Sequence, residues 1–136
     1  MITVQNINLS IFPSLVVPVD AKQSVISLVD RINANVKDAS KKPIIHLVSV
    51  VKNVNDYELN RYMLQLNNQK SVFVENGFIV TAEFIKISEG DEKIAEAIID
   101  YASRLESTLL VDESLLKKID TSKKDLTETN SSIIFI

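Results

Sequence analysis

The sequence contains no cysteine, a single histidine (His46), and only two glycines and three prolines in 136 residues. The lack of cysteine excludes disulfides, thiolate metal sites and thiol catalysis. A single histidine excludes zinc sites built from several histidines. With so few glycines, the chain has no glycine-rich loop of the kind that cradles phosphates in nucleotide-binding motifs.

Long apolar runs and a basic surplus are also lacking. No apolar run approaches the roughly 18 residues of a membrane span, and the N-terminus lacks the basic and apolar regions of a signal peptide. We therefore expect a cytoplasmic protein that has no membrane partner. The formal net charge of −3 argues against broad non-specific binding of nucleic acid, which needs a basic surface, although a local basic patch is compatible with it.

The composition is that of a folded globular protein. Hydrophobic residues make up 46% of the chain and charged residues 24%, which is typical of a domain with a sizeable core. The sequence shows no internal repeat, low-complexity tract or linker. We expect a single domain over residues 1–136.

Short apolar runs in the first half predict strands. Apolar and polar residues alternate from Ile2 to Ile11 with one phase slip, which predicts a strand and an irregular piece closed by Pro13. A second apolar run covers 15–17, and a third, rich in β-branched residues, covers 44–51.

A predicted helix lies between the second and third runs. Asp20 followed by Gln23 matches a capping box, in which two side chains cap N–H groups at a helix start. Apolar residues then recur at every third or fourth position, which predicts a helix over 21–37. These residues are Val25, Leu28, Val29, Ile32 and Val36.

The middle of the chain predicts a second helix and a hairpin. Helical spacing of apolar residues predicts a helix over 53–66. The pair Asn76-Gly77 then separates two β-rich runs, 71–75 and 78–82. An Asn-Gly pair in that setting is a strong hairpin signal, because both turn positions need a positive φ.

The last third returns to alternation of helix and strand. An acidic start at 89–92 opens an apolar-periodic segment, and a buried strand at 108–111 ends directly in Asp112-Glu113. A short helix over 114–119 and a final strand over 132–136 follow. The whole order predicts a three-layer α/β fold, with a mostly parallel twisted sheet flanked by helices and a local β-hairpin.

Several of these segments resemble PIN-domain proteins. In that family an acidic residue opens the third main helix, a buried strand delivers a second acid in a T-x-D-like run, and a short last strand closes the sheet. Here Leu110 stands where the threonine would be. Residues 4–9 look like the family's first strand, which normally ends in an aspartate. The matching segments in the last third are Gly90–Ala95, Leu109–Leu115 and Ile133–Ile136.

The resemblance implies a ribonuclease that uses Mg²⁺ or Mn²⁺ to activate water, with RNA as its partner and no small-molecule cofactor. Asp91 and Asp112 match acidic positions of the family. Asn6, or Gln5 in a shifted register, replaces the first-strand aspartate. The predicted catalytic residues are thus Asp91, Asp112 and Asn6, and the predicted metal ligands are these three with Glu58, or Asp56 in its place.

Loss of the first-strand carboxylate lowers the expected affinity for a strongly hydrated cation. The resemblance therefore implies a nuclease whose activity is weakened or lost. The alternative is a non-catalytic module for protein interaction or assembly on the same scaffold.

Each candidate residue also has a purely structural interpretation. Asp91 and Asp112 could simply cap helices. His46 is expected to be a buried or half-buried structural residue rather than a general base. Tyr57 and Tyr62 could stack on a base, although core packing is the stronger expectation. A lysine cluster could touch a phosphate backbone or form a solvated face; its members are Lys117, Lys118, Lys123 and Lys124.

The apolar C-terminus, Ile133–Ile136, has two interpretations. It could be a strand inside the chain's own sheet. It could instead pair with a second copy across sheet edges, which would give a homodimer.

Overall fold

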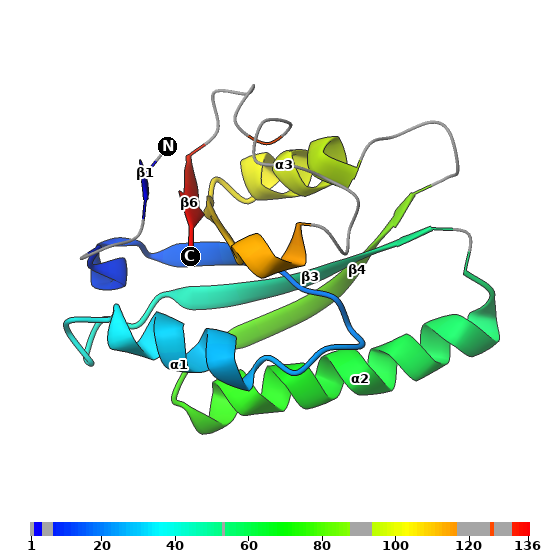
Figure 1. The fold of residues 1–136 in the computed structure, drawn as a ribbon, viewed down its shortest axis with the longest axis horizontal. Helices are drawn as coiled ribbons and strands as arrows, with labels where there is room; N and C mark the ends of the chain where they lie inside the picture. The colour runs from blue at the N-terminus through cyan, green and yellow to red at the C-terminus, as the bar shows by residue number, and fades with distance from the viewer. Residues whose placement is uncertain (1, 4–6, 53, 88–93, 117–125, 127–131) are drawn as a thin grey trace.

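Figure 1 shows the computed structural model of the protein, which describes residues 2–3, 7–52, 54–87, 94–116, 126 and 132–136. Its strands are β1 (Ile2–Thr3), β2 (Ser14–Pro18), β3 (Ile44–Lys52), β4 (Val80–Ile87), β5 (Thr108–Val111) and β6 (Ile133–Phe135). Its helices are α1 (Ile26–Ala34), α2 (Asp56–Glu75) and α3 (Ile94–Arg104), with short 3₁₀ turns η1 (Leu9–Ile11) and η2 (Glu113–Leu115).

The six strands form one sheet in the order β1-β6-β5-β2-β3-β4, and every neighbouring pair is parallel. Helices α1 and α2 lie on one side of this sheet and α3 lies on the other (Figure 1). The predicted three-layer α/β fold is therefore confirmed. The sheet is wholly parallel among the described strands. Helices α1, α2 and α3 supply the crossovers from β2 to β3, from β3 to β4 and from β4 to β5, which parallel strands need.

Side chains of successive strand residues pack into two separate hydrophobic cores, one on each side of the sheet. On β2, Leu15 and Val17 belong to the core shared with α1 and α2, whereas Val16 belongs to the core shared with α3. Both faces of the central strands are thus buried, as is usual for parallel sheets. This explains why 15–17 and 109–111 are continuous apolar runs and not alternating ones.

Helix α1 begins later than the sequence predicts. Its N-cap position is Val25, which makes no side-chain capping bond. The predicted capping box from Asp20 to Gln23 is wrong, because these residues form a turn in which the Gln23 N–H donates to the Asp20 carbonyl at 3.0 Å. The predicted apolar face is confirmed, since Leu28, Val29 and Ile32 are buried.

The predicted hairpin at Asn76-Gly77 is also wrong. Helix α2 continues through 71–75 to Glu75, and Asn76 is its C-cap. Gly77 has a φ of +87° and donates to the Val74 carbonyl, while the Phe78 N–H donates to the Phe73 carbonyl. This bond pattern is a Schellman motif, in which a glycine adopts the left-handed conformation just after a helix.

Packing explains why this segment is a helix. Leu66, Gln69 and Phe73 are buried at helical spacing along α2. The Phe73 and Phe78 rings then meet edge to face, with centroids 5.9 Å apart. This is the apolar contact that accompanies a Schellman motif, so burial of one face outweighs the β propensity of residues 71–75.

The C-terminal strand lies inside the sheet. Strand β6 pairs with β5 on one side and with β1 on the other. Both of its edges are occupied within the chain, so dimerisation through 133–136 is not the arrangement seen. Near the N-terminus, Asn8 caps η1 and is not part of a strand.

Among the described residues, no helix combines the length and the apolar character needed to cross a membrane.

We expect Gly77→Ala to destabilise the protein by about 1–2 kcal/mol, because an L residue is strained at this left-handed position. An added Cβ would also lie 3.0 Å from Lys42 Nζ, although that flexible end can move. Urea unfolding measures the change. Gly77→Asn is the matched control and should cost less, since asparagine tolerates this conformation. Equal stability of Gly77→Ala and wild type would contradict the prediction.

Candidate functional site

The order of the strands reverses between β2 and β5. From β2 the chain proceeds outward to β3 and β4, then crosses back to β5 and outward again to β6. In open parallel sheets, ligands bind beyond the carboxyl ends of the strands near such a switch point. The carboxyl ends of β2, β3 and β5 are therefore the place to look for a site.

A pocket of about 330 Å³ opens at the carboxyl ends of β2 and β3. Its walls come from the turn after β2, the last residues of β3, the segment before α2, and one side chain each from α2 and α3. The lining residues are Val19, Asp20, Ala21, Lys22, Ser49, Val50, Val51, Lys52, Val54, Tyr62 and Ile94. Mostly apolar walls with a few polar groups are typical of small-molecule sites.

Hydrogen bonds from α2 fix the turn that follows β2. Gln69 is only 4% exposed, and its Nε2 donates to the carbonyls of Asp20 and Gln23, each at 2.7 Å. Within the turn, Asp20 Oδ1 accepts from the Lys22 N–H at 3.0 Å. The wall of the pocket is thus fixed by a side chain that lies 49 residues further along the chain.

The polar groups of the pocket differ in character. Ser49 is buried at 4% exposure and brings a hydroxyl group into the lining of the pocket. Lys22 Nζ lies 5.1 Å from the centroid of the Tyr62 ring, within cation–π range. Together with Asp20 and Lys52, the pocket offers both charge signs, a hydroxyl and an aromatic ring.

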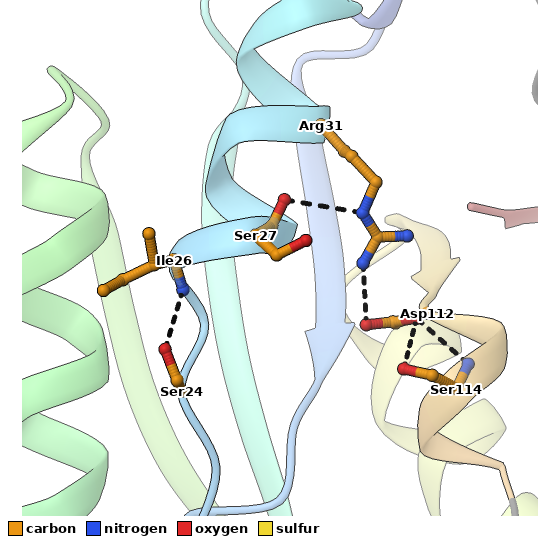
Figure 2. Close-up of polar contacts among 6 residues, drawn as sticks. All are labelled: Ser24, Ile26, Ser27, Arg31, Asp112 and Ser114. Atoms are coloured by element: carbon orange, nitrogen blue, oxygen red, sulfur yellow. Dashed lines mark hydrogen bonds and ion pairs between the residues drawn. The ribbon is translucent and has the colours of Figure 1, made fainter.

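Figure 2 shows that the switch point itself is occupied by an ion pair. Arg31 from α1 donates through one terminal nitrogen to Asp112 Oδ2 at 3.0 Å. Asp112 Oδ1 accepts from the backbone N–H of Ser114 at 3.0 Å and from its hydroxyl at 2.8 Å. Only about 20 Å³ of space remains here, in a crevice that Val19, Asp20 and Asp112 help to line.

Two of the residues predicted from the sequence can be placed. Asp112 is the N-cap of η2, which confirms its capping interpretation. Glu58 lies in the first turn of α2, where its N–H donates to Asn55 Oδ1 at 2.8 Å and its Oε1 accepts from Asn55 Nδ2 at 3.1 Å. Asn6 and Asp91 lie outside the described residues, so the positions predicted for them stay predictions. Glu58 and Asp112 line different pockets.

The residues that shape the pocket are not among those predicted from the sequence. Asp20 follows an apolar strand just as Asp112 does, and this shared position was a usable signal. Tyr57 is 71% exposed, so its predicted core packing is wrong, whereas Tyr62 is half-buried at the pocket. No local signal marks Ser49, which is one polar residue within an apolar strand. The lysine cluster from Lys117 to Lys124 lies outside the described residues.

A second polar cluster lies on the α3 side of the sheet. His46 is half-buried, as predicted, and its Nδ1 is 2.7 Å from Thr81 Oγ1. Burial lowers the pKa of His46 below its usual 6.5, and Glu83 opposes this in part. The Tyr101 hydroxyl donates to Glu83 at 2.9 Å; burial, followed by this bond, raises the pKa of Tyr101 to about 12.

Fold and pocket together define an open, doubly wound parallel α/β protein with a ligand-sized pocket at the carboxyl edge of its sheet. No protein-family model and no curated protein sequence matches the chain.

Solved structures do match it. A universal stress protein from Archaeoglobus fulgidus in complex with dAMP is 17% identical, with a TM-score of 0.64 over 93% of this chain and 98% of that chain. A universal stress protein in complex with cAMP is 12% identical, with a TM-score of 0.66 over 92% and 96%. A protein of the universal stress protein family from Burkholderia pseudomallei is 14% identical, with a TM-score of 0.60 over 91% and 96%. At these identities the likeness establishes the fold.

These matches correct the resemblance to PIN-domain proteins, which is wrong. Asp112, one of the acids that suggested it, directly follows β5 and caps η2, and carboxylates are common at such capping positions. The resemblance implies a first strand over 4–9. Of these residues, Asn8 caps η1 and Leu9 begins it, and the strand at the centre of the sheet is β2.

Because they depended on that resemblance, three further predictions are wrong as well. These are the ribonuclease function, the alternative of an assembly module on a PIN-like scaffold, and the RNA partner. The Mg²⁺ or Mn²⁺ prediction is contradicted as well. Within the described ranges, no three His, Asp or Glu side chains form a group that could hold a metal ion. Two of the similar structures are described instead in complex with dAMP and cAMP.

We expect Gln69→Leu to loosen the turn at 20–23. Because the two lost hydrogen bonds contribute about 1 kcal/mol each, the amides of Lys22 and Gln23 should exchange with deuterium roughly thirtyfold faster. Gln65→Leu is the control, because Gln65 lies one turn earlier on α2, whereas the bonds to the two carbonyls of the turn come from Gln69. A uniform acceleration across all amides, or none in the turn, would contradict a local role for Gln69.

The lowered pKa of His46 predicts a pH dependence of stability. The folded protein favours the neutral imidazole, so the unfolded chain binds more protons as the pH falls below 6.5. The free energy of unfolding should therefore decrease on acidification through this range. His46→Gln should show a shallower decrease in thermal unfolding experiments between about pH 7.5 and pH 5. Identical slopes, or a histidine NMR titration centred above 6.5, would refute the prediction.

Proposed function

We propose that the protein binds a small planar ligand of the nucleoside monophosphate class in the pocket at the carboxyl ends of β2 and β3. The observation that carries the proposal is the pocket itself, since its volume of about 330 Å³ lies in the range of small-molecule sites. It also lies at the edge of the sheet where ligands bind in this architecture.

The lining chemistry supports such a ligand. The apolar side chains of Val19, Val51 and Ile94 can enclose a heterocycle, and the buried Ser49 hydroxyl can hydrogen-bond its edge. Lys22 and Lys52 supply positive charge at the same pocket for one phosphate group. Two of the similar structures are described as complexes with dAMP and cAMP, each of which carries one phosphate group.

Isothermal titration calorimetry with AMP and adenosine tests the proposal. We expect Val54→Trp to weaken AMP binding by roughly tenfold or more, because the larger side chain fills the pocket. Val74→Trp is the matched control, since Val74 is exposed on α2 and lines none of the pockets described above. Absence of heat with both ligands at millimolar concentration, or equal weakening by the two variants, would overturn the proposal.

We further propose three general properties of the protein. Residues 1–136 unfold as one unit, and the protein acts in the cytoplasm. Any homodimer uses a surface other than β6. The second point rests on the sequence alone, whereas the third follows from the pairing of both edges of β6. Sedimentation of the protein at micromolar concentration reports whether a dimer forms.

A further inference from the structure

At the switch point between β2 and β5 lies a negatively charged side chain of the protein, the carboxylate of Asp112. Asp112 stands directly after β5, with a side chain that is 16% exposed. Its carboxylate accepts from Arg31, from the Ser114 N–H and from the Ser114 hydroxyl. A cation, a backbone N–H and a hydroxyl are the groups that proteins use to hold a phosphate. Here a carboxylate occupies them (Figure 2).

The switch point adjoins the proposed nucleotide pocket. Val19 and Asp20 line both the 330 Å³ pocket and the small crevice beside Asp112. A ligand that extended from the pocket toward β5 would therefore pass Asp20 and then meet Asp112. Both side chains are carboxylates, so they repel the negatively charged phosphates of a ligand that extends in this direction.

The groups beside Asp112 that could offset this repulsion are already engaged. Besides its bond to Asp112, Arg31 donates through Nε to the Ser27 carbonyl of its own helix at 3.4 Å. In the segment after β5, the N–H of Leu115 donates to the Asp112 carbonyl at 2.9 Å. The chain's two glycines are Gly77 and Gly90, so residues 112–116 contain none that would let the backbone wrap a phosphate.

We infer that Asp112 is a specificity-determining residue that restricts the pocket to ligands with at most one phosphate and excludes nucleoside di- and triphosphates. This inference rests on the proposed function. Asp112 acts through its charge: it neutralises Arg31 and places a carboxylate on the path that the second and third phosphates would take.

Two reciprocal variants separate charge from structure. Asp112→Asn removes the negative charge and frees Arg31, while the asparagine Oδ1 can still accept from the Ser114 N–H. Arg31→Gln breaks the same ion pair but keeps the negative charge of Asp112. A purely structural role of the pair would make the two variants behave alike, whereas exclusion by charge makes them differ.

Calorimetric titrations with AMP and ATP in EDTA test the inference on wild type and both variants. We expect wild type to bind AMP at least roughly tenfold more tightly than ATP. Asp112→Asn should reduce this preference by roughly tenfold through a gain in ATP affinity, and Arg31→Gln should retain or increase it. Urea unfolding checks that each variant is folded. If Asp112→Asn does not fold, Asp112→Ser replaces it in the titrations, because the serine hydroxyl can also cap η2.

The outcomes can be told apart. Binding of AMP and ATP with equal affinity by wild type would overturn the inference and leave the proposed function standing. An unchanged preference in Asp112→Asn, or an equal gain of ATP affinity in Arg31→Gln, would also overturn it. No binding of AMP by wild type would overturn the proposed function and the inference together.

Discussion

The parallel pairing of β2 with two neighbours is the constraint on which the rest of the structure depends. Leu15 of β2 is in register with Ile45 of β3 on one side and with Thr108 of β5 on the other. This pairing buries β2 on both faces and so creates two cores, one under α1 and α2 and one under α3. It also creates the switch point, because the chain leaves β2 in one direction and returns on its other side.

Two polar contacts then determine what lies at the carboxyl edge of the sheet. Gln69 fixes the turn after β2 by bonding two of its carbonyls, which gives the pocket a defined wall. Arg31 and Asp112 tie α1 to the segment after β5 and fill the switch point. Because the Arg31 side chain is 40% exposed, solvent screens this ion pair and limits the stability that it adds. Its main consequence is the distribution of charge and open space at this edge. Space lies between β2 and β3, and charge lies between β2 and β5.

Elements whose signal is local and undisturbed could be predicted from the sequence. Strand β5 was predicted at 108–111 and is found there, and β3 was predicted at 44–51 and extends one residue further. The start of α1 and the end of α2 could not be predicted in the same way. At Asp20 a bond from Gln69 stabilises a turn where a helix cap was expected. At Asn76-Gly77 the burial of Phe73 extends a helix where a hairpin was expected.

The sequence by itself determined the layers of this protein, because the period of its apolar residues decides locally which segments are helices and which are buried strands. Only the tertiary structure decided the order of the strands and the task of each carboxylate. Asp20 and Asp112 both come after a strand, and the residues near them do not reveal the role that each carboxylate has in the fold. Their roles differ because Asp112 pairs with Arg31, a residue 81 positions earlier in the chain, whereas Asp20 lies beside an open pocket. Contacts between residues so distant in the chain depend on the complete packing of the fold, which no local pattern encodes.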